Sequence, residues 1–188
     1  LYTINGAKLW NSGVKGTPIY VDVSDNGEGL LSTDFWKILF IAEGRILWDK
    51  AGYGFARFAR SGDRIIATAR GDSGIFIFNR GGEPLWEYQG AFHYVVSDNY
   101  YVLGSDEEIV LVTAKGEVLQ RVEVSKLGFG EVERIEYIEI SPDGRYFAVM
   151  IKNHSGGCYL YFFENRDFLI RDIKERLLKQ IDELIKRY

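Results

Sequence analysis

The chain has 188 residues, of which 46% are hydrophobic and 15% aromatic, and this is enough for one domain with a sizeable core. Its net charge of −4 disfavours a nucleic-acid partner, because phosphate binding requires a basic surface. The single cysteine, Cys158, excludes an internal disulfide, and no stretch approaches the roughly 20 apolar residues of a transmembrane span.

The composition favours strands over helices. The 21 glycines and the many aromatic residues are typical of a β-rich chain with tight turns. Few Cys and Met beside ample Glu, Lys and Arg also resemble the composition of thermophile proteins. No signal peptide is visible, but the chain begins with Leu1 and not Met, so its location stays open, with the cytoplasm slightly favoured.

The first repeated unit is an apolar strand, a glycine turn and a Leu-Trp pair. Its glycines are Gly6, Gly44, Gly82 and Gly116, which lie 38, 38 and 34 residues apart. Three copies end in Leu-Trp, whereas the fourth has Gln120 in place of Trp. We expect each Trp to lie on an outer strand and to cover the seam between neighbouring units, as core packing and not as a ligand platform.

The second repeated unit is an apolar strand that ends in Ser, followed by a polar turn and another apolar strand. Its serines are Ser24, Ser61, Ser97 and Ser141, at intervals of 37, 36 and 44 residues. The Ser-Pro-Asp-Gly segment at 141–144 predicts a hairpin turn, because Pro presets φ, Asp bonds the local backbone and Gly accepts a positive φ.

The two units alternate, so each repeat of 34 to 44 residues holds four short strands, named a to d. Strand b follows the Ser turn and is expected at Arg64–Ala69, Tyr100–Leu103 and Arg145–Ile151. Strand c precedes the glycine turn, and strand d carries Leu-Trp. Four short strands at this spacing predict the antiparallel blades of an all-β propeller.

The strand–turn–Gly-x-x-Leu-Trp unit resembles the repeat of quinoprotein-like, or PQQ-like, β-propellers. The segment at 141–149 also resembles WD40-type repeats. Strict WD40 repeats carry Gly-His and Trp-Asp marks, of which this chain has only Trp48-Asp49, so the PQQ-like resemblance is favoured. The resemblance covers nearly all of residues 1–171, and its motifs report fold and not activity.

The same resemblance bears on cofactors. Quinoprotein dehydrogenases add a calcium site, a catalytic aspartate and, commonly, adjacent cysteines that form a disulfide. This chain has one cysteine and no obvious acidic cluster with calcium-ligand spacing. We therefore expect no quinone, no metal and no catalytic residue, in keeping with the many family members that have lost the cofactor and serve as scaffolds.

The strand pattern predicts about four and a half blades. The half blade is 1–10, and the full blades are 18–48, 54–88, 92–124 and 135–171, the last of them ending in a strand at Phe168–Arg171. An open array leaves blade faces and strand edges exposed. The favoured interpretation is therefore the C-terminal part of a propeller of seven or eight blades, whose N-terminal blades are missing. The alternatives are that residues 1–10 close a small ring, or that another copy completes it.

Residues 172–188 change from strand to helix periodicity. Apolar residues recur there along one helical stripe, with favourable i,i+4 charge pairs beside it. Asp172 and Glu175 have the spacing of a capping box, which places the start of the helix at 172. Packing on the propeller rim is its favoured role, and a partner-binding or coiled-coil helix and a membrane-surface helix are the alternatives.

The two histidines and the cysteine are candidate metal ligands. His154 and Cys158 lie four residues apart in one loop, but a structural zinc site needs four ligands and no second pair is visible. His93 lies near a strand a and is expected to be structural. No Gly-x-Ser-x-Gly nucleophile turn and no Walker-type phosphate loop is present.

Three loops also carry suggestive residues. Arg70-Gly71-Asp72 spells an integrin-type tripeptide, but it falls in a turn where Gly and Asp are expected anyway. The acidic loops at 25–28 and 106–108 are expected to be solvated turns that could join a partner surface.

The favoured function is a non-catalytic scaffold that binds a protein partner through loops on one face of the ring or through the helix. The alternative is a small-ligand-binding or enzymatic propeller with its site in the central channel, where polar groups from several blades meet. A third hypothesis is an architectural half of a larger surface or secreted protein. An enzyme is the less favoured class, and no residue is assigned to a partner site.

Overall fold

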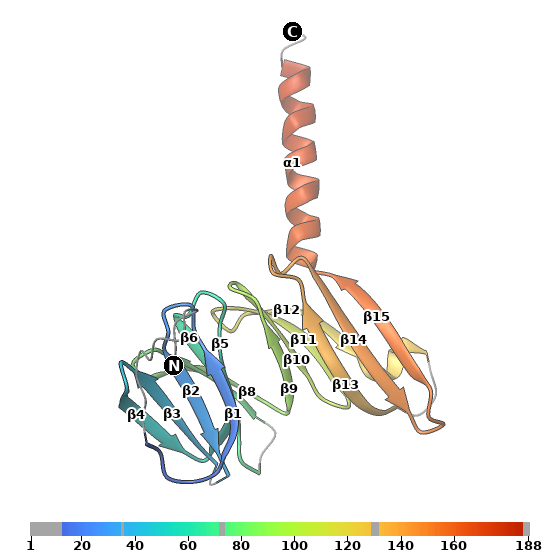
Figure 1. The fold of residues 1–188 in the computed structure, drawn as a ribbon. Coiled ribbons are helices and arrows are strands. Elements are labelled where there is room, and N and C mark those ends of the chain that lie inside the picture. The colour runs from blue at the N-terminus through green and yellow to red at the C-terminus, as the bar shows by residue number, and fades with distance from the viewer. Residues whose placement is uncertain (1–12, 35, 72–73, 129–131, 186–188) are drawn as a thin grey trace, which may run out of the picture. The chain divides into compact units, whose positions relative to one another are not determined.

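The computed structural model describes residues 13–34, 36–71, 74–128 and 132–185. The chain divides into two compact units, Leu1–Phe92 and His93–Tyr188, and each is described by itself. Within the described residues, strands form four antiparallel sheets and a long helix follows the last of them (Figure 1). The half blade expected at 1–10 lies outside the described residues.

The first unit holds two four-stranded sheets whose strands pair in chain order. The strands of its first sheet are β1 (Pro18–Val23), β2 (Gly29–Thr33), β3 (Lys37–Ala42) and β4 (Arg45–Ala51). Those of its second sheet are β5 (Tyr53–Phe58), β6 (Arg64–Ala69), β7 (Gly74–Asn79) and β8 (Pro84–Gln89). Consecutive strands that are joined by short turns form the meander of a propeller blade.

The second unit holds a four-stranded and a three-stranded sheet. The strands of the four-stranded sheet are β9 (His93–Val96), β10 (Tyr100–Gly104), β11 (Glu108–Thr113) and β12 (Val118–Glu123). A short 3-10 helix, η1 (Val124–Leu127), comes next. The last elements are β13 (Val132–Ile140), β14 (Tyr146–Asn153), β15 (Cys158–Glu164) and helix α1 (Arg166–Ile185).

The start of the helix differs from the prediction. The prediction of a strand at Phe168–Arg171 is wrong, because these residues lie in α1, which begins at Arg166. The reason is Asn165, a fully buried residue whose side-chain oxygen accepts a hydrogen bond from the N–H of Asp167 (3.0 Å). This N-cap starts the helix directly after β15, so the fourth sheet has no strand d among the described residues.

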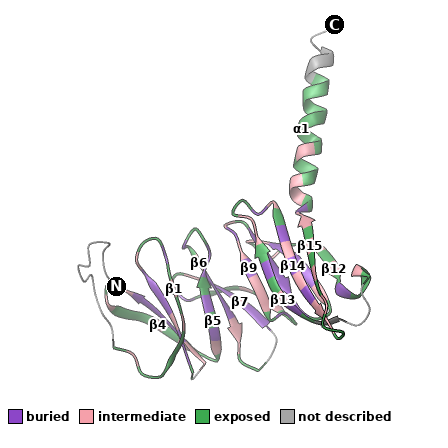
Figure 2. Ribbon diagram, turned by 45° about the vertical axis from the view of Figure 1, so that its right-hand side comes forward, coloured by how far each residue is buried: buried purple, intermediate pink, exposed green. Residues whose placement is uncertain are grey.

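Each unit has an apolar core between its two sheets (Figure 2). In the first unit, Leu30 and Phe40 of the first sheet pack with Phe58 and Ile65 of the second. The side chain of Asp22 on β1 also accepts a hydrogen bond from the N–H of Phe58 on β5 (2.7 Å). Strand a of the later sheet is therefore held directly against the earlier one.

The Trp of the Leu-Trp mark covers the seam between these two sheets, as expected. The indole N–H of Trp48 donates to the carbonyl oxygen of Arg80 (2.8 Å), in the turn between β7 and β8. Its ring lies over Gly82, where an added Cβ would come within 3.1 Å. Gly82 has a φ of +81°, which favours glycine. The guanidinium of Arg80 pairs with Glu28 of the first sheet and closes the same seam.

Candidate functional site

Strand c of each sheet carries an apolar residue four places before its last residue and another two places before it. The two residues share one face of the sheet, because alternate residues of a strand point the same way. The pairs are Ile38 and Phe40, Ile75 and Ile77, Ile109 and Leu111, and Leu160 and Phe162. In the first and third sheets, this pair lies in the core that forms against the following sheet of the same unit. These positions therefore mark the face on which the next blade packs.

The fourth pair has a different environment from the other three. The first three pairs are buried, with no more than 2% of any of these residues exposed. Leu160 and Phe162 are 58% and 76% exposed. The fourth sheet thus keeps the apolar residues of a packing face, but no described part of the chain covers them.

Neighbouring strands extend this exposed surface. Across the sheet, Met150 is paired with Tyr137 and with Leu160, and Ala148 with Glu139 and with Phe162. Paired residues lie on the same face of a sheet, so Tyr137, which is 66% exposed, adds a second ring to it. The surface is called the open face below, and it comprises Tyr137, Tyr146, Ala148, Met150, Leu160 and Phe162.

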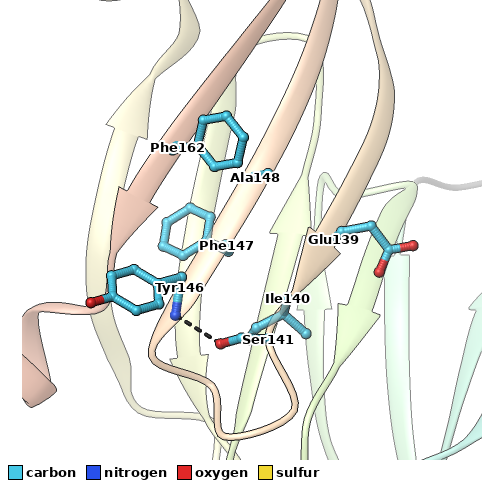
Figure 3. Close-up of a pocket in the computed structure, with 7 residues that line it drawn as sticks. All are labelled: Glu139, Ile140, Ser141, Tyr146, Phe147, Ala148 and Phe162. Carbon is cyan, nitrogen blue, oxygen red and sulfur yellow. Dashed lines mark hydrogen bonds between the residues drawn. The ribbon is translucent and has the colours of Figure 1, made fainter.

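The open face contains a shallow hollow of about 230 Å³. Figure 3 shows Tyr146, Ala148 and Phe162 along it, with Glu139 and Ser141 on the neighbouring strand. The hydroxyl oxygen of Ser141 is engaged, because it accepts a hydrogen bond from the N–H of Tyr146 (2.9 Å). A mostly apolar hollow with a carboxylate at its edge suits an apolar side chain of a partner protein.

The turn between β13 and β14 supports the open face, and it has the predicted hairpin geometry. Gly144 has a φ of +77°, and its N–H donates to the carbonyl oxygen of Ser141 (2.8 Å). The carboxylate of Asp143 accepts from the hydroxyl of Ser141 (2.6 Å) and from the N–H of Arg145 (3.0 Å). These two bonds lower the pKa of Asp143. A Cβ on Gly144 would collide with Tyr100, so the turn is seated on the preceding sheet.

A polar cluster attaches α1 to the same sheet. The guanidinium of Arg145 donates to Glu164 (2.9 Å) and to Asp172 (2.6 Å), and these carboxylates raise its pKa. The hydroxyl of Tyr100 donates to Asp167 (2.7 Å). Burial and this bond raise the pKa of Tyr100. Residues 164–172 are thereby fixed to two sheets of their own unit.

Beyond its base, α1 presents a second apolar surface (Figure 2). Its exposed apolar residues are Leu169, Ile170, Ile173, Leu177, Leu178 and Ile181, each about half exposed. Packing on the rim, the favoured role from sequence, would bury this stripe, and these side chains remain open. Among the described residues, no helix is long and apolar enough to cross a membrane.

The structure does not gather the sequence-selected histidines and cysteine into one site. His154 and Cys158 are exposed in the β14–β15 hairpin. His93 begins β9, where desolvation lowers its pKa although Asp106 and Glu136 act in the opposite direction. Within residues that are described, no three His, Cys, Asp or Glu side chains form a group that could hold a metal ion.

The acidic loops are exposed at Asp25, Asp106 and Glu107, as expected, but the last residue of each loop is engaged in an ion pair. Glu28 is buried and pairs with Arg80, and Glu108 accepts two hydrogen bonds from Arg121 (3.0 and 2.8 Å). Arg80 is 52 residues from Glu28 in the chain, so the local sequence carried no signal for that pair. Of the integrin-type tripeptide, Asp72 lies outside the described residues.

Comparison with known proteins identifies the fold. No family model matches the chain, and no curated protein matches it by sequence. Solved structures do match: the β-propeller domain of Cps50 (Swd1) from Myceliophteria thermophila has 14% identity and a TM-score of 0.59. Hydrazine synthase from Kuenenia stuttgartiensis has 10% identity and a TM-score of 0.60. The dihydro-heme d1 dehydrogenase NirN, in complex with DHE, has 14% identity and a TM-score of 0.60.

These matches cover most of this chain and much less of the other proteins. They span 78%, 81% and 82% of this chain, but 53%, 49% and 36% of the three matched chains. At such low identity the likeness shows the fold alone. The chain is an all-β protein with the antiparallel blades of a β-propeller and a C-terminal helix, and it spans about half the length of the first two matched chains.

Proposed function

We propose that this protein is a non-catalytic β-propeller scaffold that mediates protein–protein interaction and is part of a larger propeller. The observation that carries the proposal is the exposure of Leu160 and Phe162 at positions that the other three sheets bury. Exposed apolar patches of this kind mark protein interaction sites more often than isolated exposed residues do.

The chemistry of the open face supports a protein partner. Aromatic and methionine side chains are enriched at the centres of protein interfaces, and the open face combines Tyr137, Tyr146 and Phe162 with Met150. Glu139 is exposed beside them and belongs to the polar rim that such interfaces have. The Gly-x-x-Leu-Trp mark supports a propeller of the PQQ-like rather than the WD40-like kind.

Site-specific photo-crosslinking tests the proposal. The photoreactive residue p-benzoylphenylalanine replaces Phe162 in the full-length protein, which is irradiated in its own cells. We expect covalent attachment to one defined polypeptide, because the ring at 162 would lie inside the interface.

The matched control places the same residue at Leu85 on β8, which is likewise an exposed apolar residue (48%) but is not part of the open face. Equal, diffuse labelling from both positions would contradict the proposal, since the open face would then behave as ordinary surface.

A further inference from the structure

The structure shows what kind of surface covers an equivalent face. In the first unit, strand a of the later sheet, β5, lies against β1, β2 and β3 of the earlier sheet. In the second unit, β13 takes the same position against β9 and β10. The occupant of the open face should therefore present a strand a with apolar side chains on its outward face.

Strand β1 meets this requirement. Tyr20 and Asp22 of β1 face β5, as shown by the hydrogen bond of Asp22 to Phe58 and by the ring contact of Tyr20 with Phe55. Alternate residues of a strand point to opposite faces, so the outward face carries Val21 and Val23, whereas Ile19 lies where the pairing register shifts between Pro18 and Tyr20. Val21 and Val23 are 62% and 50% exposed.

We propose that a second copy of this chain covers the open face, with its β1 packed against Tyr137, Leu160 and Phe162. This inference rests on the proposed function, because it takes the open face to be the docking site. In this contact, short β-branched side chains of β1 would pack against the large rings of the open face. Charged residues border both surfaces: Glu139, Glu164 and Lys152 pair with residues of the open-face side of their sheet. On the sheet of β1, Asp49 shares the face of Val21.

The contact joins two different surfaces, so it is a heterologous contact that repeats from copy to copy. The described residues of two copies supply eight sheets, and propellers contain about 4 to 8 blades. A dimer held by two identical contacts would therefore match the blade number of known propellers.

Single charges on each surface test the contact. In Phe162→Arg the charge lies on the open face, and in Val21→Arg it lies on β1. Sedimentation velocity and native mass spectrometry should show a dimer for the wild-type chain. For each variant we expect the dissociation constant of the dimer to rise roughly 100-fold, which is typical when a residue at the centre of an interface is changed. Leu85→Arg, an exposed site outside both surfaces, is the control and should dimerise normally.

Mixing the variants separates this arrangement from a symmetric one. A heterodimer of Phe162→Arg and Val21→Arg retains one intact contact, so mixing them should restore part of the dimer. If two open faces met each other instead, Val21→Arg alone would dimerise like the wild type, which would overturn the proposal. A wild-type chain that stays monomeric at every concentration would also overturn it.

The crosslinking at position 162 distinguishes failure of this inference from failure of the proposed function. Attachment to another copy of the chain supports both. Attachment to a different polypeptide, or within one longer polypeptide, overturns the second-copy contact and leaves the scaffold function standing. Diffuse labelling overturns both.

Discussion

At the scale of single residues, the Trp and the glycine of the first repeated unit turn out to be the two sides of one contact between successive copies. Trp48 ends one sheet, and Gly82 lies in the last turn of the next, where the indole ring covers it. This pairing also accounts for Gln120, which replaces Trp in the fourth copy. The fourth sheet leads from β15 directly into α1, so a Trp at 120 would have no following glycine turn to cover.

Replacing Gly82 with Ala should destabilise the first unit. The alanine would have to adopt a φ of +81°, and its Cβ would lie 3.1 Å from the Trp48 ring. We expect a loss of about 2–3 kcal/mol in the free energy of unfolding, measured by urea titration. Gly52→Ala is the control, because Gly52 has a φ of +86° but no neighbour near its Cβ position, and it should lose only about 1 kcal/mol. Equal losses would mean that the ring contact contributes nothing.

At the scale of elements, the local turns and strands followed from the sequence, but the helix start did not. The strand expected at Arg64–Ala69 and the hairpin turn at 141–144 were confirmed, because their signals are local alternation and turn chemistry. Phe168–Arg171 is an apolar run that suits a strand or a helix equally well. What decides between them is Asn165, and its capping role depends on burial beneath the turn at Gly144, which is 21 residues away.

The open face was equally hidden from the sequence. Leu160 and Phe162 have the same apolar character as the buried pairs in the other strands c, so their residue types carry no sign of exposure. Whether such residues are exposed depends on whether a neighbouring sheet covers them, and not on the sequence of their own strand. Only the burial of the equivalent positions in the four sheets distinguishes the open face from the covered ones.

Asn165 should matter to both the helix and the last sheet. Its side chain caps α1 and also donates to the carbonyl oxygen of Gly144 (3.0 Å), and the residue is fully buried. Asn165→Ala should therefore cost about 2 kcal/mol and lower the helical signal in circular dichroism.

Asn165→Asp serves as the control, because it keeps the capping oxygen while it loses the donor to Gly144 and places a carboxylate at a buried position. It should retain the helical signal although it loses stability. A wild-type helical signal in Asn165→Ala would show that the Arg145 cluster alone starts the helix.

At the scale of the whole molecule, each of the two compact units has an apolar cluster of its own. The residues that give spectroscopic signals are also distributed between the two units. All four Trp residues of the chain, at 10, 36, 48 and 86, fall in the first unit, whereas α1 belongs to the second. Fluorescence and helical circular dichroism can therefore follow the units separately.

We expect the two units to unfold in separate transitions, because repeat proteins gain stability from neighbouring contacts and not from the whole chain at once. Gly82→Ala should lower the urea midpoint of Trp fluorescence and leave the midpoint of the 222 nm signal in place. Equal shifts in both signals would show a single cooperative unit instead. Asn165→Ala should conversely lower the urea midpoint of the 222 nm signal and leave the midpoint of Trp fluorescence in place.

The open face also has a consequence for how a cell handles this protein. A chain that has just been synthesised displays Phe162 and its neighbours until they are covered, and uncovered apolar surface promotes aggregation in proportion to concentration. The outer edge of β15 has no paired strand among the described residues, and such an edge is a template for further strand pairing. Prompt assembly is thus a condition for keeping the chain in solution, and production in excess of its partner should lead to inclusion bodies or degradation.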